Sequence, residues 1–327
     1  MLRSRIIGTG HCLPKNVVTN TDLEKIMDTT DEWIRQRTGI LQRHISCGEG
    51  ESVSDLATAA SKMAMERAGV TADEIDCIIC ATMTPDYLCP ASAPLIQNNL
   101  GAMKASAFDL NAACSGFVYS LEVANGLIQS GVHKTVLVIG AEVLSVRLDW
   151  QSRETAVLFG DGAGAVVLRG EQGDRGIIST FSRADGSACD MLHIPAGGTR
   201  QPITPENIDT VVRGLNMDGR ALYKRAVHAF GEATYEALAR AGIRAEDIDL
   251  FVPHQANLRI ITAAVERIGL PEDKIFLNLD RVANTSAASI PIALDDAVTQ
   301  GLIKDFDIVL LAAFGAGLTW ASAVVRW

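Results

Sequence analysis

The sequence contains an internal repeat at a constant offset, and this repeat sets strong limits on the fold. The segment RAGVTADEID at 67–76 returns as RAGIRAEDID at 240–249, so that Gly69 corresponds to Gly242 and the offset in numbering is 242 − 69 = 173. The same offset places VLV at 136–138 on VLL at 309–311, and LEVA at 121–124 on LDDA at 294–297. Helix-end and strand patterns recur in many α/β proteins, but three segments in one register indicate duplication. We therefore predict two homologous halves, residues 1–170 and 171–327.

Each half alternates between helical and strand-like patterns. Helices are predicted where apolar residues recur at helical spacing, and strands where short apolar runs are continuous. The predicted helices are 52–68, 115–130, 221–241 and 286–298, and the predicted strands are 75–83, 107–110, 136–141, 250–253 and 308–313. Fully apolar strands favour mainly parallel sheets with helices on both faces. Two such halves packed together predict an α/β fold of five layers.

Two segments need separate interpretation. Residues 308–325 carry no charge over 18 positions, which is near the lower limit for a membrane-spanning helix. The sequence Gly315-Ala316-Gly317 interrupts this run, so two buried strands joined by a tight turn explain it better. Residues 182–218 are irregular and rich in Gly, Pro, Asp and Thr, which is typical either of a functional lid or of a surface excursion.

Charge and cysteine content indicate the compartment and exclude some partners. The net charge of −10 disfavours nucleic acid and anionic membrane surfaces as partners. The N-terminus MLRSRIIGT runs directly into strand-like sequence and does not resemble a signal peptide. Seven cysteines at scattered spacings do not form a disulfide framework and suit a reducing compartment. We therefore predict a cytoplasmic protein.

Cys114 is the first candidate for chemistry. It lies in NAACSGF, between a strand-like run and the start of a predicted helix. The positive end of a helix dipole lowers a thiol pKa from about 8.5, and the small neighbours leave room for a substrate. A buried structural cysteine is the common alternative, so the position alone leaves both interpretations open.

The duplication adds two partners to Cys114. The offset places it on residue 287, inside NTSAAS, so Asn284 would lie near it if the two helix starts face each other. His254 directly follows a predicted strand in VPHQAN, and strand ends are where α/β proteins place ligand sites. Cys114, His254 and Asn284 are therefore predicted to converge.

Other residues of these types lack such a setting. The five remaining histidines, at 11, 44, 133, 193 and 228, are interpreted as structural residues in loops or on helix surfaces. Cys77 and Cys80 form a C-x-x-C inside an apolar strand, with no second ligand pair nearby, which argues against a zinc or redox site. The glycines at 160–164 lack the Lys-Ser/Thr of a phosphate loop and suggest close backbone packing instead.

With these motifs in place, the whole sequence resembles the β-ketoacyl-acyl carrier protein synthase III family of thiolase-fold condensing enzymes. The resemblance rests on NAACSGF, PHQANLRI and NTSAAS in that order, and on DEWIRQRTGI at 31–40, FGDGAGA at 159–165 and the C-terminal FGAGLTW. Related thiolases use a second cysteine and elongating synthases a second histidine. The asparagine at 284 therefore favours the initiating class.

The resemblance implies a mechanism with two half-reactions. Cys114 takes an acyl group from acyl-CoA, and the backbone N–H groups of Cys114 and Ala316 stabilise the oxyanion. Malonyl-acyl carrier protein then binds, and His254 and Asn284 donate hydrogen bonds to its thioester carbonyl as CO2 leaves. The enolate attacks the acylated cysteine and gives a β-ketoacyl thioester. The resemblance implies neither a metal nor an organic cofactor.

The resemblance also implies which residues bind CoA and the acyl carrier protein, and it implies a homodimer. The expected contacts of CoA are Trp33, Arg37, Arg153, Gly219 and Asn257, and the expected docking residues for the acyl carrier protein are Lys224 and Arg259. An amphipathic helix anchor is the alternative role of the Trp33-Ile34 pair. Ala316 replaces a glycine common in the family, and Cys89 is smaller than the residue that often caps the partner's acyl pocket, so the preferred starter acyl group stays open.

Two rival functions remain. The first is a priming ketosynthase or acyltransferase of a secondary-metabolite pathway, which would keep Cys114 but use another acceptor. The second is a non-catalytic thioester-binding protein, which would have no need of a complete Cys-His-Asn set.

Overall fold

Two β-sheets and the helices between and outside them make up the fold. A computed structural model describes all residues, 1–327. The longer helices are α3 (Val53–Ala68), α4 (Ser92–Leu100), α5 (Gly116–Gln129), α6 (Gly219–Ala241), α7 (Leu258–Ile268) and α9 (Ser289–Thr299). The shorter helices are α1 (Asn20–Leu23), α2 (Asp31–Thr38) and α8 (Leu279–Val282), and two 3₁₀ turns, η2 (Ala113–Ser115) and η7 (Ser286–Ala288), precede α5 and α9.

The sheets are mixed, not mainly parallel. The order in the first sheet is β1 (Leu2–Cys12), β7 (Gly162–Gln172), β6 (Thr135–Glu142), β4 (Cys77–Ala81) and β5 (Ser106–Leu110). The order in the second is β11 (Leu250–Pro253), β12 (Ile308–Gly315), β13 (Thr319–Arg326) and β8 (Gly176–Ala184). Two small pairs complete the strands: β2 (Val17–Thr19) with β3 (Gln42–His44), and β9 (Leu192–His193) with β10 (Asn216–Met217).

The prediction of mainly parallel sheets was wrong because the outer strands run antiparallel. Only the β4–β5, β4–β6 and β11–β12 pairings are parallel. The connection from β12 to β13 spans residues 316–318, which is too short for the crossover that a parallel pair needs. Continuous apolar runs report burial on both faces but carry no information on strand direction.

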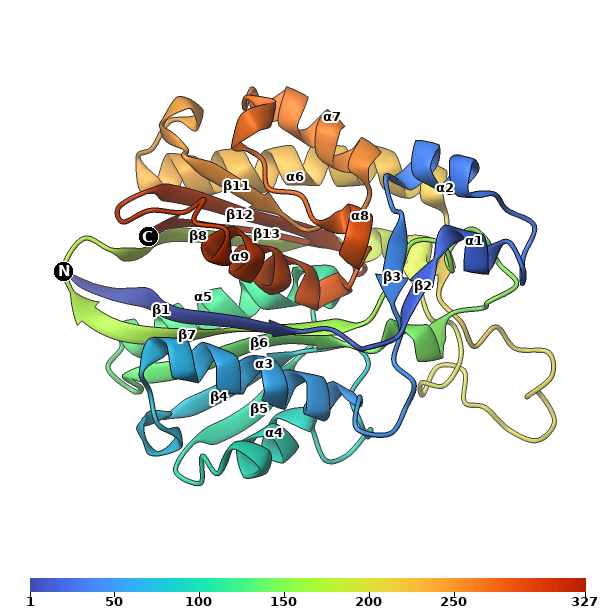
Figure 1. The fold of residues 1–327 in the computed structure, drawn as a ribbon, viewed down its shortest axis with the longest axis horizontal. Helices are drawn as coiled ribbons and strands as arrows, with labels where there is room; N and C mark the ends of the chain where they lie inside the picture. The colour runs from blue at the N-terminus through green and yellow to red at the C-terminus, as the bar shows by residue number, and fades with distance from the viewer.

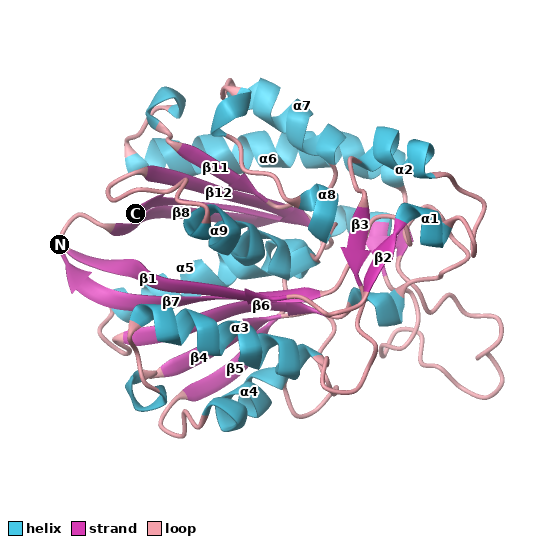
Figure 2. Ribbon diagram, in the orientation of Figure 1, coloured by secondary structure: helices cyan, strands magenta, loops and turns pink.

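The layers follow the predicted five-layered arrangement (Figure 1). Helices α3 and α4 cover the outer face of the first sheet, α5 and α9 lie between the two sheets, and α6 and α7 cover the second sheet. Figure 2 shows the same alternation of helical and strand layers by colour. The site described below lies where the central helices begin.

The backbone repeats at the offset read from the sequence. Strand β6 (135–142) and strand β12 (308–315) have the same length and coincide at this offset, and Gly69 and Gly242 end their helices with φ of 62° and 66°. Not every element follows the repeat: the offset places β5, for example, on the short helix α8. The division of the chain at 170/171 stays a prediction, and it falls within β7.

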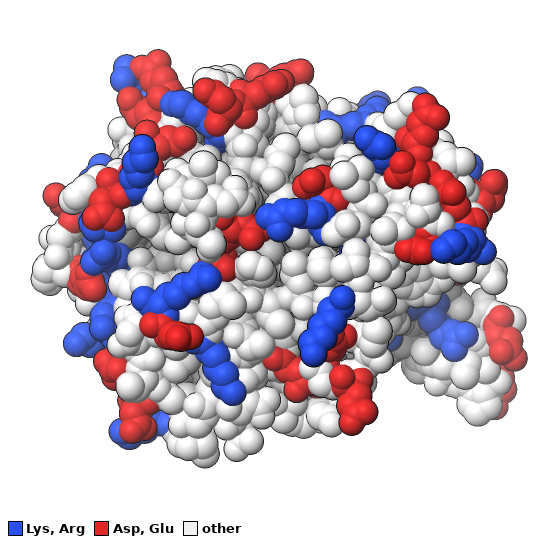
Figure 3. Space-filling model, viewed as in Figure 1, with Lys and Arg blue, Asp and Glu red and all other residues white.

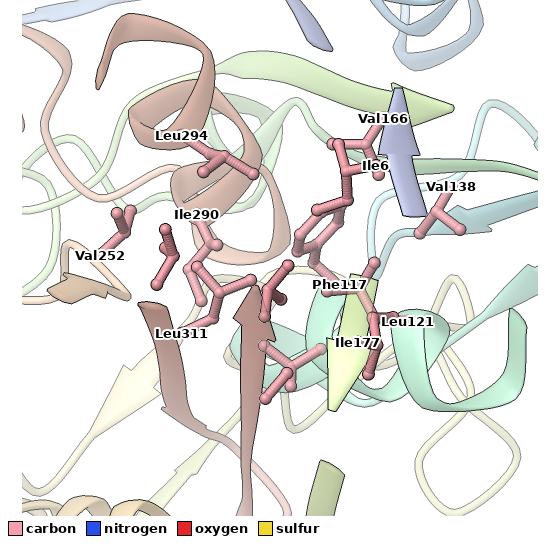
Figure 4. Packing of buried hydrophobic residues seen from close by; sticks show 14 of the residues in the cluster. Ile6, Phe117, Leu121, Val138, Val166, Ile177, Val252, Ile290, Leu294 and Leu311 are labelled. Atoms are coloured by element: carbon pink, nitrogen blue, oxygen red, sulfur yellow. The ribbon is translucent and has the colours of Figure 1, made fainter. Parts of the chain in front are cut away.

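Small residues bring the central helices against the sheets. A Cβ added at Gly140 would lie 2.2 Å from the carbonyl oxygen of Ala287, and one at Gly164 would lie 2.6 Å from the amide nitrogen of Ile292. This close approach agrees with the packing role predicted for the glycines at 160–164. Figure 4 shows the core that results, in which Phe117 of α5 and Ile290 of α9 pack together with side chains of both sheets. Full burial of a side chain such as Phe117 contributes about 2–3 kcal/mol.

The two unusual segments fold as follows. Residues 308–325 form the antiparallel strands β12 and β13, as predicted. None of the helices is both long enough and apolar enough to cross a bilayer. The segment 182–218 ends β8, supplies the short pair β9 and β10, and between them forms a loop that projects from the body on the right of Figure 1.

Candidate active site

Cys114 lies at the start of α5 and is pressed against the second half of the chain. It is in turn η2 and only 7% exposed. A Cβ at Gly315, the last residue of β12, would lie 2.7 Å from the Cys114 nitrogen and 2.9 Å from its Cβ. Glycine is therefore required at 315 for the approach of β12 to the cysteine. The backbone N–H groups of Cys114 and Ala316 lie close to the sulfur and favour its ionised form.

The thiol is less acidic than the sequence predicted. Burial raises the pKa of Cys114 to about 11, and the nearby Glu142 carboxyl raises it further. The Ser286 hydroxyl and the backbone N–H groups beside the sulfur lower the pKa but do not offset burial. The lowering expected at the helix start is outweighed because the second half of the chain closes over the sulfur. A neutral thiol therefore predominates near neutral pH.

His254 is held as a neutral imidazole. It follows β11 directly, is 1% exposed, and its Nδ1 lies 2.5 Å from Ser289 Oγ. The Gln255 N–H donates to the same oxygen at 3.4 Å, so the Ser289 proton is free to be donated to Nδ1. Burial lowers the pKa of His254 to about 3. Nε2 then carries the ring proton and remains as the donor for a ligand.

Asn284 is fixed by backbone contacts on both sides. Its main chain pairs with residues 158–160, as Asn284 N–H donates to Leu158 O (3.0 Å) and Gly160 N–H donates to Asn284 O (3.0 Å). Its side-chain Oδ1 accepts from the Ser286 N–H at 2.9 Å. Because the oxygen is taken, the orientation of the amide is set and the NH2 group is the end left to donate, with only a 3.5 Å contact to Ala256 O.

One cavity of about 510 Å³ brings most of the predicted residues together. Its lining includes all three candidates for chemistry and five of the seven candidates for binding: Cys114, His254, Asn284, Arg37, Gly219, Asn257, Lys224 and Arg259. These positions come from α2, η2, α6, α7 and the loops after β11 and α8. The predicted convergence of Cys114, His254 and Asn284 is therefore confirmed in their placement, while their roles stay predictions.

Trp33 and Arg153 lie outside that lining and contact each other. The Arg153 guanidinium is 5.0 Å from the centre of the Trp33 ring, and the Arg37 guanidinium is 5.5 Å from it. Arg153 also donates to Asp28 O at 2.9 Å. The ring thus already has cations stacked against it, and a purine would have to displace one of them. Ile34 beside it is fully buried, so the alternative role of this helix as an anchor also holds.

The binding candidates at the cavity mouth differ in their local roles. Asn257 caps α7, where its Oδ1 accepts from the Arg259 N–H at 2.9 Å, and its Nδ2 donates to Arg37 O at 3.2 Å. Lys224 and Arg259 are exposed, and with Arg37 and Arg220 they make the cavity rim cationic. Elsewhere charges of both signs are interspersed over the face seen in Figure 3.

Three of the other histidines lie in strands, which corrects their predicted loop or helix-surface setting. They are His11 in β1, His44 in β3 and His193 in β9. His11 Nδ1 lies 2.6 Å from the buried Asp295 carboxylate, a link between two distant parts of the sequence that no local pattern shows. Cys77 and Cys80 are both buried in β4 but pack into different core clusters, so their side chains do not converge.

Four residues important at the site were missed from the sequence. Phe314 and Leu192 line the cavity with apolar surface, and Ser286 and Glu142 contact or face Cys114. Glu142 carried a detectable signal, because it ends β6 of the first sheet as His254 follows β11 of the second, and strand ends are where α/β proteins place ligand sites. Leu192 comes from the irregular segment 182–218, so the ends of that segment line the cavity while its middle runs over the surface.

Glu142 is a fully buried carboxyl with neutral partners. Burial raises its pKa from 4.5 to about 7, although hydrogen bonds from Thr84, the Met83 N–H, Ser286 and Thr82 act the other way. In the folded chain it therefore binds a proton more tightly than in the unfolded chain. The folded state loses stability as pH rises from about 4.5 to about 7, since the unfolded chain ionises first.

Replacing Glu142 with glutamine is expected to remove this loss. At about pH 8 the variant should be more stable than the wild type, by up to about 3 kcal/mol, and near pH 4.5 the advantage should vanish. Urea unfolding at both pH values measures it. Glu266→Gln, at an exposed position on α7, is the matched control and should leave the pH dependence of stability as it is. An equal effect of Glu142→Gln at both pH values would contradict the assignment.

Comparison with known proteins agrees with the geometry of the site. Residues 108–186 match the 3-oxoacyl-[acyl-carrier-protein (ACP)] synthase III domain, and residues 238–327 match the C-terminal domain of the same synthase. The chain is 49% identical over 322 residues to the β-ketoacyl-[acyl-carrier-protein] synthase III of Caldanaerobacter subterraneus subsp. tengcongensis, with 98% of this chain and 97% of that one covered. It is 50% identical over 324 residues to the synthase III of Xanthomonas campestris pv. campestris, covering 99% and 98%.

A solved structure shows the same fold. The crystal structure of 3-oxoacyl-[acyl-carrier-protein] synthase III from Aquifex aeolicus matches with a TM-score of 0.92 and 46% identity, over 99% of this chain and 100% of that one. The thiolase fold predicted from the motifs is thus confirmed over the whole length. From its two domains, its near-full-length relatives and its fold, the chain belongs to the β-ketoacyl-[acyl-carrier-protein] synthase III family.

Proposed function

We propose that this protein is the initiating ketosynthase of fatty acid synthesis. It transfers an acyl group from acyl-CoA to Cys114, condenses it with malonyl-acyl carrier protein, and releases CO2, CoA and β-ketoacyl-acyl carrier protein. The observation that carries the proposal is one cavity that holds a cysteine at a helix start, a neutral histidine and an oriented asparagine amide. Relatives with about half of their residues identical are synthases of this name.

In the first half-reaction, the Cys114 sulfur attacks the acyl thioester carbonyl. The N–H groups of Cys114 and Ala316 converge on the sulfur and serve as the oxyanion hole, each contributing about 3 kcal/mol to the transition state. Ala316 can supply its N–H because its φ is not in the left-handed region, whereas Gly317 has φ of 134°. The replacement of a glycine by alanine at 316 is thus compatible with this role.

In the second half-reaction, His254 and Asn284 stabilise the enolate of the malonyl group. A charge develops on the thioester oxygen as CO2 leaves, and two neutral donors directed at that oxygen lower the barrier. Ser289 holds the His254 tautomer with Nε2–H, and the Ser286 N–H holds the Asn284 amide with NH2 free. Each step runs through protein groups and the two thioesters, so the proposal includes no cofactor.

The substrates enter by the cationic mouth of the cavity. We assign the binding of CoA to five residues: Trp33, Arg37, Arg153, Gly219 and Asn257. The Arg153 guanidinium would move away from the Trp33 ring so that the purine of CoA can stack there. Lys224 and Arg259 dock the acidic acyl carrier protein. A homodimer remains part of the proposal: Leu88, next to Cys89, is 93% exposed and would be covered by a second copy. The cytoplasmic location stays a prediction.

Charge reversal at the mouth tests the docking assignment. Lys224→Glu or Arg259→Glu is expected to lower kcat/KM for malonyl-acyl carrier protein about tenfold, and kcat/KM for acyl-CoA much less, because a rim charge chiefly affects the encounter with a charged protein. The loss should shrink as salt rises. Lys62→Glu, an exposed reversal on α3, is the control. Equal losses for both substrates would argue against a docking patch.

Intact mass spectrometry tests the function as a whole. The protein is incubated with acyl-CoA thioesters from acetyl to octanoyl, including branched members. We expect a mass gain that maps to Cys114 and is discharged by malonyl-acyl carrier protein with release of CO2. The preferred acyl group identifies the starter and reports how the small Cys89 affects the pocket. No adduct with any member would remove the covalent step and the proposed function with it.

The priming β-ketosynthase of the R1128 polyketide pathway shares the fold at 36% identity, but neither rival function is favoured over the proposed one. A secondary-pathway priming enzyme would acylate Cys114 but fail to use malonyl-acyl carrier protein, and the same experiment separates it. A non-catalytic binding protein does not explain why histidine and asparagine are held in donor orientation around a cysteine. The relatives at about 50% identity favour the initiating ketosynthase.

A further inference from the structure

Glu142 is a buried carboxyl that accepts several hydrogen bonds but has no cation beside it. It is the last residue of β6, is completely buried, and has neutral partners. Thr84 Oγ1 donates to Oε2 at 2.5 Å, Thr82 Oγ1 donates to it at 3.3 Å, and the Met83 N–H lies 3.2 Å from both oxygens. Burying a carboxyl without a cation is costly, so such a group is retained where it has a task.

Ser286 connects this carboxyl to the nucleophile. Its hydroxyl donates to Glu142 Oε1 at 3.2 Å, and it lies beside the Cys114 sulfur because turns η2 and η7 pack against each other. A hydroxyl can donate to a carboxylate while it accepts from a thiol, so the three groups form a continuous path. The Ser286 backbone is held in the left-handed region at φ 50°, a conformation that costs energy for a residue other than glycine.

The strained position recurs at the equivalent point of the first half. Ala113, which the sequence offset places on Ser286, has φ of 47° and directly precedes Cys114. The two turns η2 and η7 therefore meet as equivalents, one presenting the thiol and the other the hydroxyl. The duplication thus places a serine from the second half against the nucleophile of the first.

The cavity offers no better acceptor for the thiol proton. Its lining contains no aspartate or glutamate, and its charged members are Arg37, Arg220, Lys224 and Arg259. The His254 ring is engaged by Ser289 at Nδ1 and is a weak base in its buried setting. The titratable groups that act on or face Glu142 are Cys114 from η2 and Cys80 from β4, and η7 and the 82–84 segment contribute only hydroxyls and N–H groups.

We propose that Glu142 takes the proton of Cys114 through the Ser286 hydroxyl while the sulfur attacks the acyl thioester. This proposal rests on the proposed function. A bond forms between the Cys114 sulfur and the acyl carbon, and the bond from that carbon to the CoA sulfur breaks. The thiol proton passes to Ser286 Oγ as the Ser286 proton passes to Glu142. Ser286 Oγ then gives a proton to the departing CoA thiolate and recovers one from Glu142, so no proton is gained or lost overall. Glu142 acts through Ser286 and is a positioning residue.

The pH profile of Cys114 acylation tests this path. Rapid-quench intact mass spectrometry gives the acylation rate with the preferred acyl-CoA, from about pH 5.5 to about pH 9. The wild-type rate should rise as Glu142 ionises, around pH 7, and then level off. Glu142→Gln and Ser286→Ala should each slow acylation about 100-fold at the plateau and remove the inflection at pH 7. The double variant should be no slower than the slower single one, because both residues belong to one path.

Two further variants separate the path from a structural effect. Thr84→Val removes a hydrogen bond that lowers the pKa of Glu142, so the inflection should move to higher pH. Ser120→Ala, a fully buried serine in α5 with no hydrogen-bond partner, controls for loss of a buried hydroxyl and should keep the wild-type rate and profile. Circular dichroism checks that each variant is folded.

The outcomes also distinguish this proposal from the function on which it rests. If the wild type forms no acyl adduct, the proposed function fails. If the wild type is acylated but Glu142→Gln retains its rate and its inflection, the proton path alone is overturned. Losses that multiply in the double variant would overturn it as well, since independent structural effects add in free energy.

Discussion

Replacing Cys114 with alanine abolishes acyl-enzyme formation and lowers ketosynthase turnover about 10⁴-fold or more. The sulfur is the one nucleophile in the cavity beside two converging N–H groups, so its loss removes the covalent step and not merely a binding contact. Cys114→Ser should lower acyl-enzyme formation and turnover almost as much, because a hydroxyl is a far weaker nucleophile at neutral pH. Intact mass spectrometry with the preferred acyl-CoA and a coupled turnover assay measure both effects.

The control is a cysteine that solvent reaches more easily. Cys189→Ala removes an exposed thiol outside the cavity and should leave the adduct and the turnover unchanged. If Cys114→Ala retains an adduct that maps to Cys189 or another exposed thiol, the labelling is non-specific transfer. Normal turnover in Cys114→Ala would exclude a covalent mechanism at this residue.

The repeat in the sequence predicted much of the fold because the repeated segments include buried strands and helices. Strand β6 and strand β12 coincide at the offset to the residue, and helices α5 and α9 begin at equivalent positions. What the repeat could not predict lies where the halves differ. The segment equivalent to β5 became α8, and strand direction was misjudged because it depends on connections and not on apolar runs.

The placement of the site was predictable, but its electrostatics were not. The symmetry argument brought Asn284 to Cys114, and the strand-end argument brought His254 there. The pKa of Cys114 depends on how tightly Gly315 and Ser286 close over the sulfur, and both come from the other half of the chain. Local sequence reports the helix start, whereas desolvation comes from distant parts of the chain.

The same limit applies to the proposed nucleotide site. Trp33 and Arg37 are one turn apart on α2, so their proximity follows from helical spacing. The position of Arg153 over the same ring requires tertiary structure, as does its anchor at Asp28. The residue types indicated a stacking site, but only the structure shows that a cation already covers the ring.

If His254 and Asn284 act only in the second half-reaction, their loss should affect decarboxylation and not acylation. His254→Ala or Asn284→Ala is expected to spare acylation of Cys114 within a few-fold, but to slow decarboxylation of malonyl-acyl carrier protein about 10²–10³-fold. The reason is that neither side chain hydrogen-bonds to the thiol, while each presents a donor to the cavity. CO2 release and the acylation rate, measured on the same preparations, give the two half-reactions separately.

A charged variant and the pH dependence of decarboxylation test this prediction further. Asn284→Asp keeps the size of the side chain but puts a negative charge where the enolate forms, so it should lose at least as much decarboxylation as alanine. Because burial lowers the pKa of His254 to about 3, the ring stays neutral between about pH 5 and about pH 8, and its ionisation should leave no inflection in decarboxylation over that range. His228→Ala, an exposed histidine of α6, is the control. Equal losses in both half-reactions for His254→Ala would mean that the histidine also serves the thiol, and the separate roles derived from the geometry would have to be abandoned.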